Sequence, residues 1–228
     1  MRQHWISLCV LLFAAIHVQA KPLLVEGNLE RWEKVILQNE TQYTPVMDME
    51  QGVVIRAVSD GSASGYEYQG KINLKRTPVL QWQWSAEQTP ETQKVLADGT
   101  RQTIKDFDET RVDGNDFVLR LIVSKKGFFQ DVKAIHYVWS HSQPLEATWN
   151  INENNKVLVV GGGKQNPMQW QTVFRHIQKD WLALFDEKID EIDSIILMTD
   201  SDHIQGQAIG YYGDMHTLAV QKMADNER

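Results

Sequence analysis

Residues 198–214, MTDSDHIQGQAIGYYGD, hold the side chains of this chain best suited to chemistry. Asp200 and Asp202 stand two positions apart, and His203 follows directly. On an extended backbone both carboxylates project to one side, roughly 6 to 7 Å apart at a rise of about 3.3 Å per residue. Glycosidase carboxyl pairs work at about 5 to 9.5 Å, but from opposite sides of the sugar. A polysaccharide hydrolase or lyase using Asp200, Asp202 and His203 is therefore an alternative and not the favoured function.

The same acids could bind a hard cation. Counting from Asp200, Gln205 occupies the position of the sharp-turn glycine of an EF-hand, and Tyr211 occupies that of the bidentate glutamate, so the sequence excludes this motif. Asp side chains also form turns by bonding nearby backbone amides, which is the more common role. We expect turn formation first, and no cofactor unless calcium binds. The candidate ligands for calcium are Asp116, Asp200, Asp202 and Asp214.

Aromatic residues recur as pairs two positions apart. On a strand, residues at i and i+2 share a face, so each pair could form either a stacking platform for sugar rings or part of a sandwich core. We expect Trp82 and Trp84 to lie in the core. The candidate ligand-binding residues are Tyr66, Tyr68, Tyr137, Trp139, Tyr211 and Tyr212.

The first twenty residues, MRQHWISLCVLLFAAIHVQA, have a short basic start, an apolar run and small residues at the end. This pattern is typical of a secretory signal peptide, and it predicts cleavage after Ala20. Because the only cysteine, Cys9, lies in this run, the mature chain would contain no thiol. We predict a periplasmic or secreted protein with one domain over residues 21–228.

Charge argues against nucleic-acid binding, and hydropathy argues against a membrane-spanning helix. Without Arg2 the chain keeps 22 basic and 30 acidic residues, so it lacks the basic excess that phosphate backbones require, and we expect no nucleic acid as partner. No segment after the leader reaches the ~18 apolar residues of a membrane helix, so we expect no membrane span.

Short segments rich in β-branched and aromatic residues predict strands, and several alternate apolar and polar residues as half-buried antiparallel strands do. In residues 175–188, one apolar stripe of Ile177, Trp181, Leu184 and Phe185 predicts a single covering helix. We therefore predict an all-β fold, a two-sheet antiparallel sandwich or jelly roll. The polar stretch 85–116 is predicted to leave the sheets as a long loop, either a mobile surface loop or a binding lid. The predicted strands span 31–37, 52–59, 65–74, 78–85, 116–124, 133–140, 155–163, 193–200 and 208–220.

Five segments in order resemble the exported bacterial family called domain of unknown function 3047: PVLQWQW, GNDFVLRLIV, IHYVWS, WQTVFRHIQKDW and IILMTDSDHIQGQAIGYYGD. The resemblance runs from about Trp32 to the end of the last predicted strand. The resemblance implies a β-sandwich similar to lectin-like and carbohydrate-binding domains, and it implies no catalytic role. The family-like positions are Trp82, Trp84, Asp116, Tyr137, Trp139, Asp200, Asp202, Gly213 and Asp214.

Export, aromatic pairs and acid-rich loops together favour a non-catalytic protein that binds a glycan or another cell-envelope ligand. Two alternatives stay open. One is the hydrolase or lyase described above. The other is a structural or assembly partner in the envelope, for which an exposed sheet edge would serve.

Overall fold

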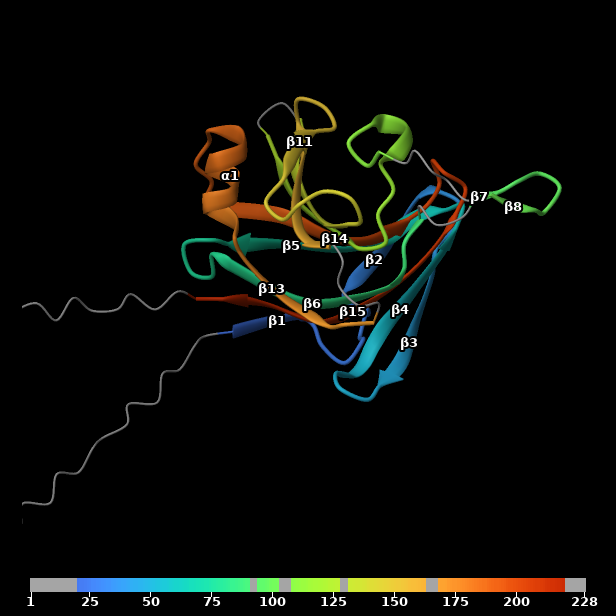
Figure 1. Ribbon diagram of the computed structural model, residues 1–228. Coiled ribbons are helices and arrows are strands. Elements are labelled where there is room, and N and C mark those ends of the chain that lie inside the picture. Colours follow the sequence, from blue (N-terminus) through green and yellow to red (C-terminus); the bar gives the residue numbers. More distant parts are fainter. Residues whose placement is uncertain (1–19, 91–93, 103–107, 128–130, 163–167, 220–228) are drawn as a thin grey trace, which may run out of the picture.

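The computed structural model describes residues 20–219 except 91–93, 103–107, 128–130 and 163–167. Two β-sheets pack face to face, with one helix at the side (Figure 1). The predicted β-sandwich is confirmed. Residues 1–19, which carry most of the predicted signal peptide, lie outside the described part of the chain.

The first sheet, sheet A, has the order β13-β6-β15-β4-β3, and β1 pairs with the end of β15. All its pairs are antiparallel. Its strands are β1 (Ala20–Leu24), β3 (Gln42–Asp48), β4 (Gly52–Asp60), β6 (Val79–Gln88), β13 (Gln171–His176) and β15 (Gln207–Leu218).

The second sheet, sheet B, has the order β11-β12-β10-β9-β14-β5-β2. One pair departs from the predicted antiparallel arrangement, because β12 runs parallel to β10 after the chain has turned back through β11. Its strands are β2 (Trp32–Gln38), β5 (Ala63–Asn73), β9 (Arg120–Lys126), β10 (Val132–Ser140), β11 (Thr148–Asn150), β12 (Asn155–Gly162) and β14 (Glu191–Asp200).

The main core lies between the sheets, where the inward residues of each strand meet. Trp82 and Trp84 are fully buried there, as predicted, with their rings edge to face at 5.3 Å. A second, smaller core lies on the outer side of sheet B. It consists of Phe117, Val138, Val157 and Val159, with Trp149 packed against them. Sheet B is therefore covered on both faces at this end.

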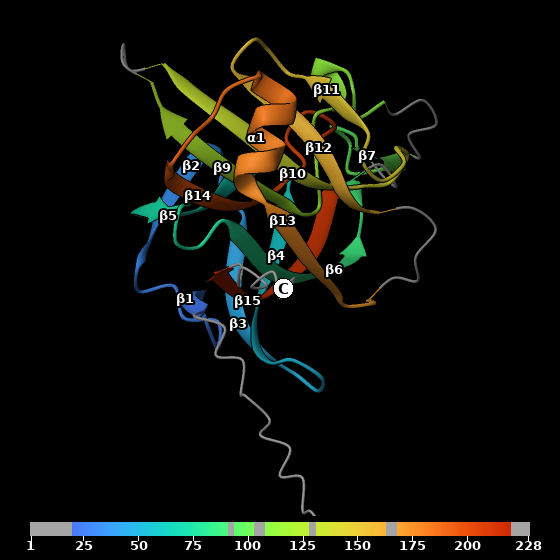
Figure 2. The ribbon, with the colours of Figure 1, turned by 90° about the vertical axis from the view of Figure 1, so that its left-hand side faces the viewer.

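The predicted helix is present as α1 (Ile177–Phe185). Ile177 and Trp181 are buried, and Leu184 and Phe185 pack against the core, so the predicted apolar stripe faces inward. The helix continues from β13 and lies beside β10 and β12 (Figure 2), where the Tyr137 hydroxyl donates to Asp180 at 2.8 Å. Within the described residues, no helix is both long and apolar enough to cross a membrane.

The polar stretch 85–116 is only partly irregular. Strand β6 extends to Gln88, a small hairpin follows as β7 (Lys94–Val95) and β8 (Arg101–Gln102), and a short 3-10 helix, η2, spans Val112–Gly114. The end of the stretch is anchored by Glu109, which is 2% exposed and accepts hydrogen bonds from the backbone N–H of His141 and the hydroxyl of Ser142. This end of the stretch is therefore held against the turn after β10.

Candidate functional site

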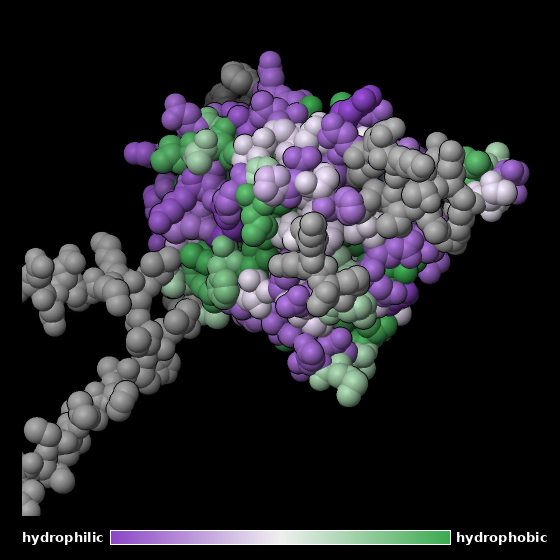
Figure 3. All heavy atoms as spheres, in the orientation of Figure 1, coloured by the Kyte–Doolittle hydropathy of each residue, from purple (hydrophilic) through white to green (hydrophobic). Residues whose placement is uncertain are grey.

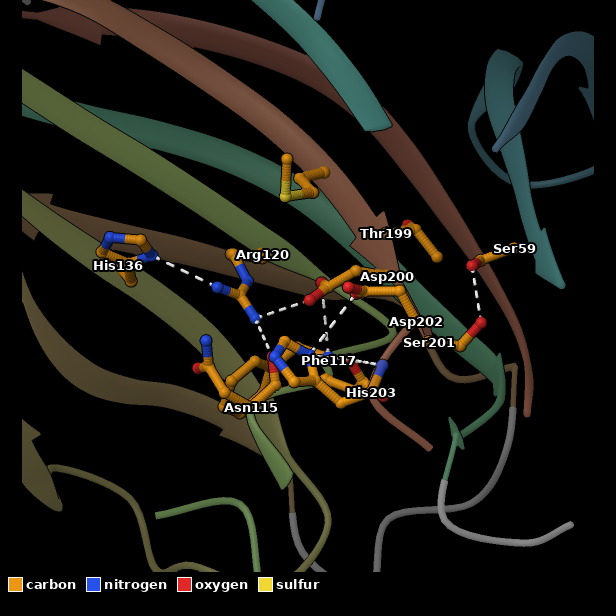
Figure 4. A network of polar contacts seen from close by, with 12 residues as sticks. Ser59, Asn115, Phe117, Arg120, His136, Thr199, Asp200, Ser201, Asp202 and His203 are labelled. Atoms are coloured by element: carbon orange, nitrogen blue, oxygen red, sulfur yellow. Dashed lines mark hydrogen bonds and ion pairs between the residues drawn. The ribbon is translucent and has the colours of Figure 1, made fainter. Parts of the chain in front are cut away.

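A buried ion pair lies below the acid-rich turn (Figure 4). The Nη2 atom of Arg120 donates to Asp200 Oδ2 at 2.7 Å and to the carbonyl of Asn115 at 2.7 Å. The two charged side chains are 4% and 5% exposed. Strand β9 places Arg120, and the end of β14 places Asp200, because these strands are neighbours in sheet B. Asp200 therefore neutralises a buried cation and presents no carboxylate to a substrate.

The ion pair continues into a buried histidine. Nη1 of Arg120 lies 3.4 Å from Nδ1 of His136, and Nε2 of His136 lies 3.1 Å from Asn155 Oδ1. Burial, followed by the charge of Arg120, lowers the pKa of His136 to about 3, so this imidazole is neutral. Since Arg120 can only donate, Nδ1 is the acceptor and Nε2 carries the proton to Asn155. Burial also raises the pKa of Asp200 well above its ordinary value, while Arg120 opposes that rise.

Asp116 fastens the turn that follows β14. One of its oxygens accepts from the backbone N–H and the ring Nδ1 of His203, at 3.3 and 3.0 Å. Its other oxygen accepts from the backbone N–H of Ile204 at 2.9 Å. Burial raises the pKa of Asp116, and these hydrogen bonds counteract the rise. The carboxylate acts as the turn-forming acid that the sequence favoured, although it comes from a segment more than eighty residues away.

Serine hydroxyls secure the other side of the same turn. The hydroxyl of Ser201 accepts from the backbone N–H of Gly61 at 3.1 Å and shares a hydrogen bond of 2.7 Å with Ser59. Ser59 and Ser201 are both fully buried. Residues 198–214 therefore form a strand, a tightly held turn and a returning strand.

Three residues are close enough together to bind one cation. Ligand atoms of Asp116, Asp202 and His203 lie within 4.8 Å of one another. Asp214 is not in this group, and its carboxylate accepts from the backbone N–H of Glu26 at 3.1 Å. Asp200 is engaged with Arg120. The predicted four-aspartate calcium site is thus not brought together by the described residues.

We expect calcium to leave the stability of this protein unchanged, because the oxygens of Asp116 already accept three N–H groups. Thermal unfolding with millimolar Ca²⁺ or excess EDTA should give unfolding temperatures within about 1 °C of each other. A calcium-dependent rise that disappears in Asp202→Asn but persists in the matched control Asp214→Asn would contradict this expectation and establish a cation site.

Most of the candidate ligand-binding aromatics are buried. Tyr137 and Tyr212 are 0% and 1% exposed. Tyr68 is tilted against Trp32 in the core, and Trp139 is also buried. Tyr66 is half-buried with its ring edge to face with Tyr43. Because the ring faces of buried side chains pack against other residues, these pairs offer no stacking platform in this structure.

Tyr211 is the candidate that remains on an outer surface. It is half-buried on the outer face of sheet A, paired with Ser85 of β6 and Arg56 of β4. Its hydroxyl donates to Glu87 and accepts from Nε of Arg56 at 3.3 Å. The adjacent ring is that of Trp170, at a centroid distance of 6.4 Å.

Trp170 lies on the outer face of sheet A because Gly213 has no side chain. A Cβ atom added to Gly213 would meet Trp170 Cζ3 at 3.3 Å and Gln83 Cβ at 3.1 Å. Gly213 sits at a bulge of β15, where the register between Tyr212 and Met215 shifts against β6. The glycine of the YYGD sequence therefore makes room for an indole ring that precedes β13.

A groove follows the edge strand β13, with a volume of about 430 Å³. Trp170 and the 57%-exposed Phe174 contribute aromatic surface. Gln169, Gln171 and Arg175 contribute polar groups. Nε1 of Trp84 donates to Gln171 Oε1 at 3.2 Å, which leaves the amide NH₂ of Gln171 for a ligand. The opposite wall is formed by Leu145, Val160 and Gly161.

A family model described as "Protein of unknown function (DUF3047)" matches residues 30–216. The chain belongs to this family. For this DUF3047 chain, a comparison with curated proteins found no match.

Solved structures with a similar fold include carbohydrate-binding modules. The solution structure of CtCBM11 has 11% identity and a TM-score of 0.43, with 92% of this chain and 100% of that one covered. The tandem CBM22 domain of Paenibacillus barcinonensis Xyn10C has 12% identity and a TM-score of 0.37, covering 94% and 50%. The enzymatically active domain of bacteriophage CBA120 tailspike protein 4 has 10% identity and a TM-score of 0.40, covering 84% of this chain and a fifth, 20%, of that one.

The sequence alone did not indicate that Trp170 and Phe174 of this DUF3047 chain contribute aromatic surface to a groove. In QWQTVFRH, Val173 and Phe174 are adjacent apolar residues, and only the strand pairing shows that Val173 points inward while Phe174 faces out beside Gln81. The one local signal for this strand is the run of β-branched and aromatic residues Thr172, Val173 and Phe174.

Proposed function

We propose that this protein is an exported, non-catalytic carbohydrate-binding protein, with its domain spanning residues 21–228. The leader-like sequence of residues 1–20 supports export. The binding surface is the groove along β13 together with the adjoining outer face of sheet A around Trp170 and Tyr211. We call this surface the β13 face.

The observation that carries this proposal is the composition of the β13 face. Accessible aromatic surface at Trp170 and Phe174 lies beside the side-chain amides of Gln81, Gln83 and Gln169. Aromatic rings bind the apolar faces of sugars, and amide groups donate to and accept from hydroxyls. Among the described residues, Gln81 and Gln83 have no hydrogen-bond partner, so their amides are available to a ligand.

The hydrolase or lyase alternative has less support. Asp200 is buried in its ion pair with Arg120, and both oxygens of Asp116 are occupied by the turn. Asp202 and His203 are the accessible members, with Nδ1 of His203 already directed at Asp116. These residues lack a second carboxylate across a sugar-sized space, which glycoside hydrolysis requires.

The envelope-partner alternative has one supporting observation. Strand β2 is an edge of sheet B, and it exposes Ile36 and Leu37 to 53% and 69%. Exposed edges can pair with a strand of another chain. Cross-linking in envelope fractions that yields a defined complex with the wild type, but not with Leu37→Lys, would favour this second function.

Trp170→Ala and Phe174→Ala are each expected to weaken glycan binding about five- to thirtyfold, because a stacked aromatic contact contributes about 1 to 2 kcal/mol. Binding partners would first be found on an array of polysaccharides and oligosaccharides, and affinities would then be measured by calorimetry. The matched control is Leu182→Ala, which removes a 41%-exposed apolar side chain from α1, away from this face. Unchanged affinity in both aromatic variants would overturn the proposal.

A further inference from the structure

The charges on the outer face of sheet A are few and mostly engaged with each other. Among the described residues that the strand register places on this face, Arg56 is the only lysine or arginine. Its Nε donates to the Tyr211 hydroxyl, which in turn donates to Glu87. Arg56 is therefore linked through a phenol to an acid. In the adjoining groove, Arg175 is paired with two carboxylates at 2.6 and 2.7 Å, so this cation of the β13 face is neutralised as well.

Two further carboxylates border the same face. Asp48 accepts hydrogen bonds from the backbone N–H groups of Glu50 and Gln51 and from the side chain of Trp170. Although its slight burial opposes the shift, these hydrogen bonds lower the pKa of Asp48, so it is ionised at neutral pH. Asp214 lies beside Gly213 and accepts from the backbone N–H of Glu26. The area around Trp170 thus carries more acids than bases, and it would repel a polyanion.

Polar recognition on this face comes from groups without charge. Side-chain amides and hydroxyls match the hydroxyls of a sugar, since both partners can donate and accept. Figure 3 shows that hydrophobic residues on the viewed side form small separate groups among hydrophilic ones. The uncharged polar side chains of the face include Thr44, Gln81, Gln83 and Thr172.

The side chains also repeat across the strands. Phe174, Gln81 and His216 are directly paired on β13, β6 and β15, and Thr172 pairs with Gln83 in the neighbouring row. Adjacent strands lie about 4.8 Å apart, which is close to the length of one pyranose residue. A linear glycan that crosses the strands would therefore place successive sugar rings over successive strands.

From this charge pattern and spacing we infer that the β13 face takes an uncharged linear glycan of at least three sugar residues, lying across β13, β6 and β15. This inference rests on the proposed function and specifies its ligand class. It excludes uronic acid polymers and sulfated glycans, which the excess of acids would repel. It also excludes cationic amino-sugar polymers as preferred ligands, because the carboxylates of Glu87, Asp48 and Asp214 already accept hydrogen bonds within the protein.

The test compares polymers of similar backbone and different charge. Affinity electrophoresis would use xylan, galactan and hydroxyethylcellulose as neutral polymers, polygalacturonate and alginate as anionic ones, and chitosan as a cationic one, each with wild type, Trp170→Ala and Leu182→Ala. We expect Trp170-dependent retardation by at least one neutral polymer. Its affinity should change less than about twofold between low and high salt, because no charge pair is formed. A trisaccharide should bind at least tenfold more tightly than the disaccharide.

The outcomes distinguish failure of the neutral ligand class or of the binding mode from failure of the glycan-binding function. Trp170-dependent binding of an anionic polymer or of chitosan in preference to the neutral ones, with marked salt sensitivity, would overturn the neutral class and keep the glycan-binding function. Equal affinity for disaccharide and trisaccharide would overturn the binding mode across the strands. If no polymer depends on Trp170, the proposed function itself fails.

Discussion

Arg120→Met is expected to destabilise the fold by about 3 to 5 kcal/mol, one of the largest effects of any single substitution in this protein. The substitution leaves Asp200 buried without its counter-charge, and breaking one partner of a buried ion pair costs this much because the remaining charge is uncompensated. It also removes the donor to the Asn115 carbonyl and the guanidinium that lies 4.6 Å from the ring of Phe117. The loss would be measured from urea unfolding curves at pH 7.

The double variant Arg120→Met/Asp200→Leu separates the ion pair from general packing. Replacing both partners of a buried pair by apolar residues is often close to neutral, so the double variant should regain at least half of the lost stability. Arg111→Met is the matched control. Arg111 pairs with Asp113 at the surface, with both side chains about 70% exposed, and its loss should cost less than about 0.5 kcal/mol. A loss below about 1 kcal/mol in Arg120→Met would contradict the assigned role.

The arrangement of strands could be predicted where local alternation is strong. The spacing predicts that Phe117, Leu119, Leu121 and Val123 share one face. Leu119, Leu121 and Val123 do lie together in the main core, whereas Phe117 lies in the smaller core on the other side of sheet B. However, β9 begins at Arg120 and not at residue 116, because the backbone N–H of Phe117 bonds to the Asp200 side chain and not to a neighbouring strand. A side-chain partner more than eighty positions away is invisible to a local pattern.

Six of the observed strands were not predicted, and the two longest of them, β3 and β13, were missed for a related reason. β3 contains Pro45 and exposed polar residues, which argue against a strand unless it lies at an edge, and β3 is indeed an edge of sheet A. β13 is the opposite edge, and its outward Phe174 disguises the alternation. Edge strands are stabilised by one neighbour only, so their sequences carry less of the buried pattern that predicts strands.

The candidate site shows the same limit. The sequence singled out the acids at 200 and 202 and the aromatic pairs, since their residue types could do chemistry. Sheet pairing then assigned Asp200 to an internal ion pair with a residue eighty positions earlier. The face proposed for binding depends on Trp170 resting on Gly213, which is a contact between β15 and the residue before β13. Such contacts follow from the order of strands in a sheet, which alternation alone does not determine.

The second large effect is a loss of stability at acid pH, which we expect to arise from His136. The folded protein keeps this imidazole neutral down to a pKa of about 3, whereas the unfolded chain takes up a proton at its ordinary value of 6.5. Below pH 6.5 the unfolded state therefore binds a proton at this residue and the folded state does not. The free energy of unfolding keeps its full value above pH 6.5 and decreases as the pH falls below it. Between pH 7.5 and 4.5 this single group should lower the free energy of unfolding by about 3 kcal/mol.

His136→Gln isolates this contribution, because glutamine can still accept from Arg120 and donate to Asn155 but does not titrate. The raised pKa of Asp200 acts in the opposite direction, since the folded state then binds a proton before the unfolded state does, and it is common to both proteins. Urea unfolding at pH 7.5 and 4.5 should therefore show a decrease in the free energy of unfolding that is about 2 to 3 kcal/mol smaller in the variant than in the wild type.

In the folded wild type, the ring signals of His136 should stay constant over this range in NMR spectra. Equal drops in both proteins, or ring signals that titrate near pH 6, would show that the Arg120 and Asp200 pair leaves His136 accessible to protons. The buried hydrogen bonds that join Asp200, Arg120, His136 and Asn155 would then be open to protons from solvent.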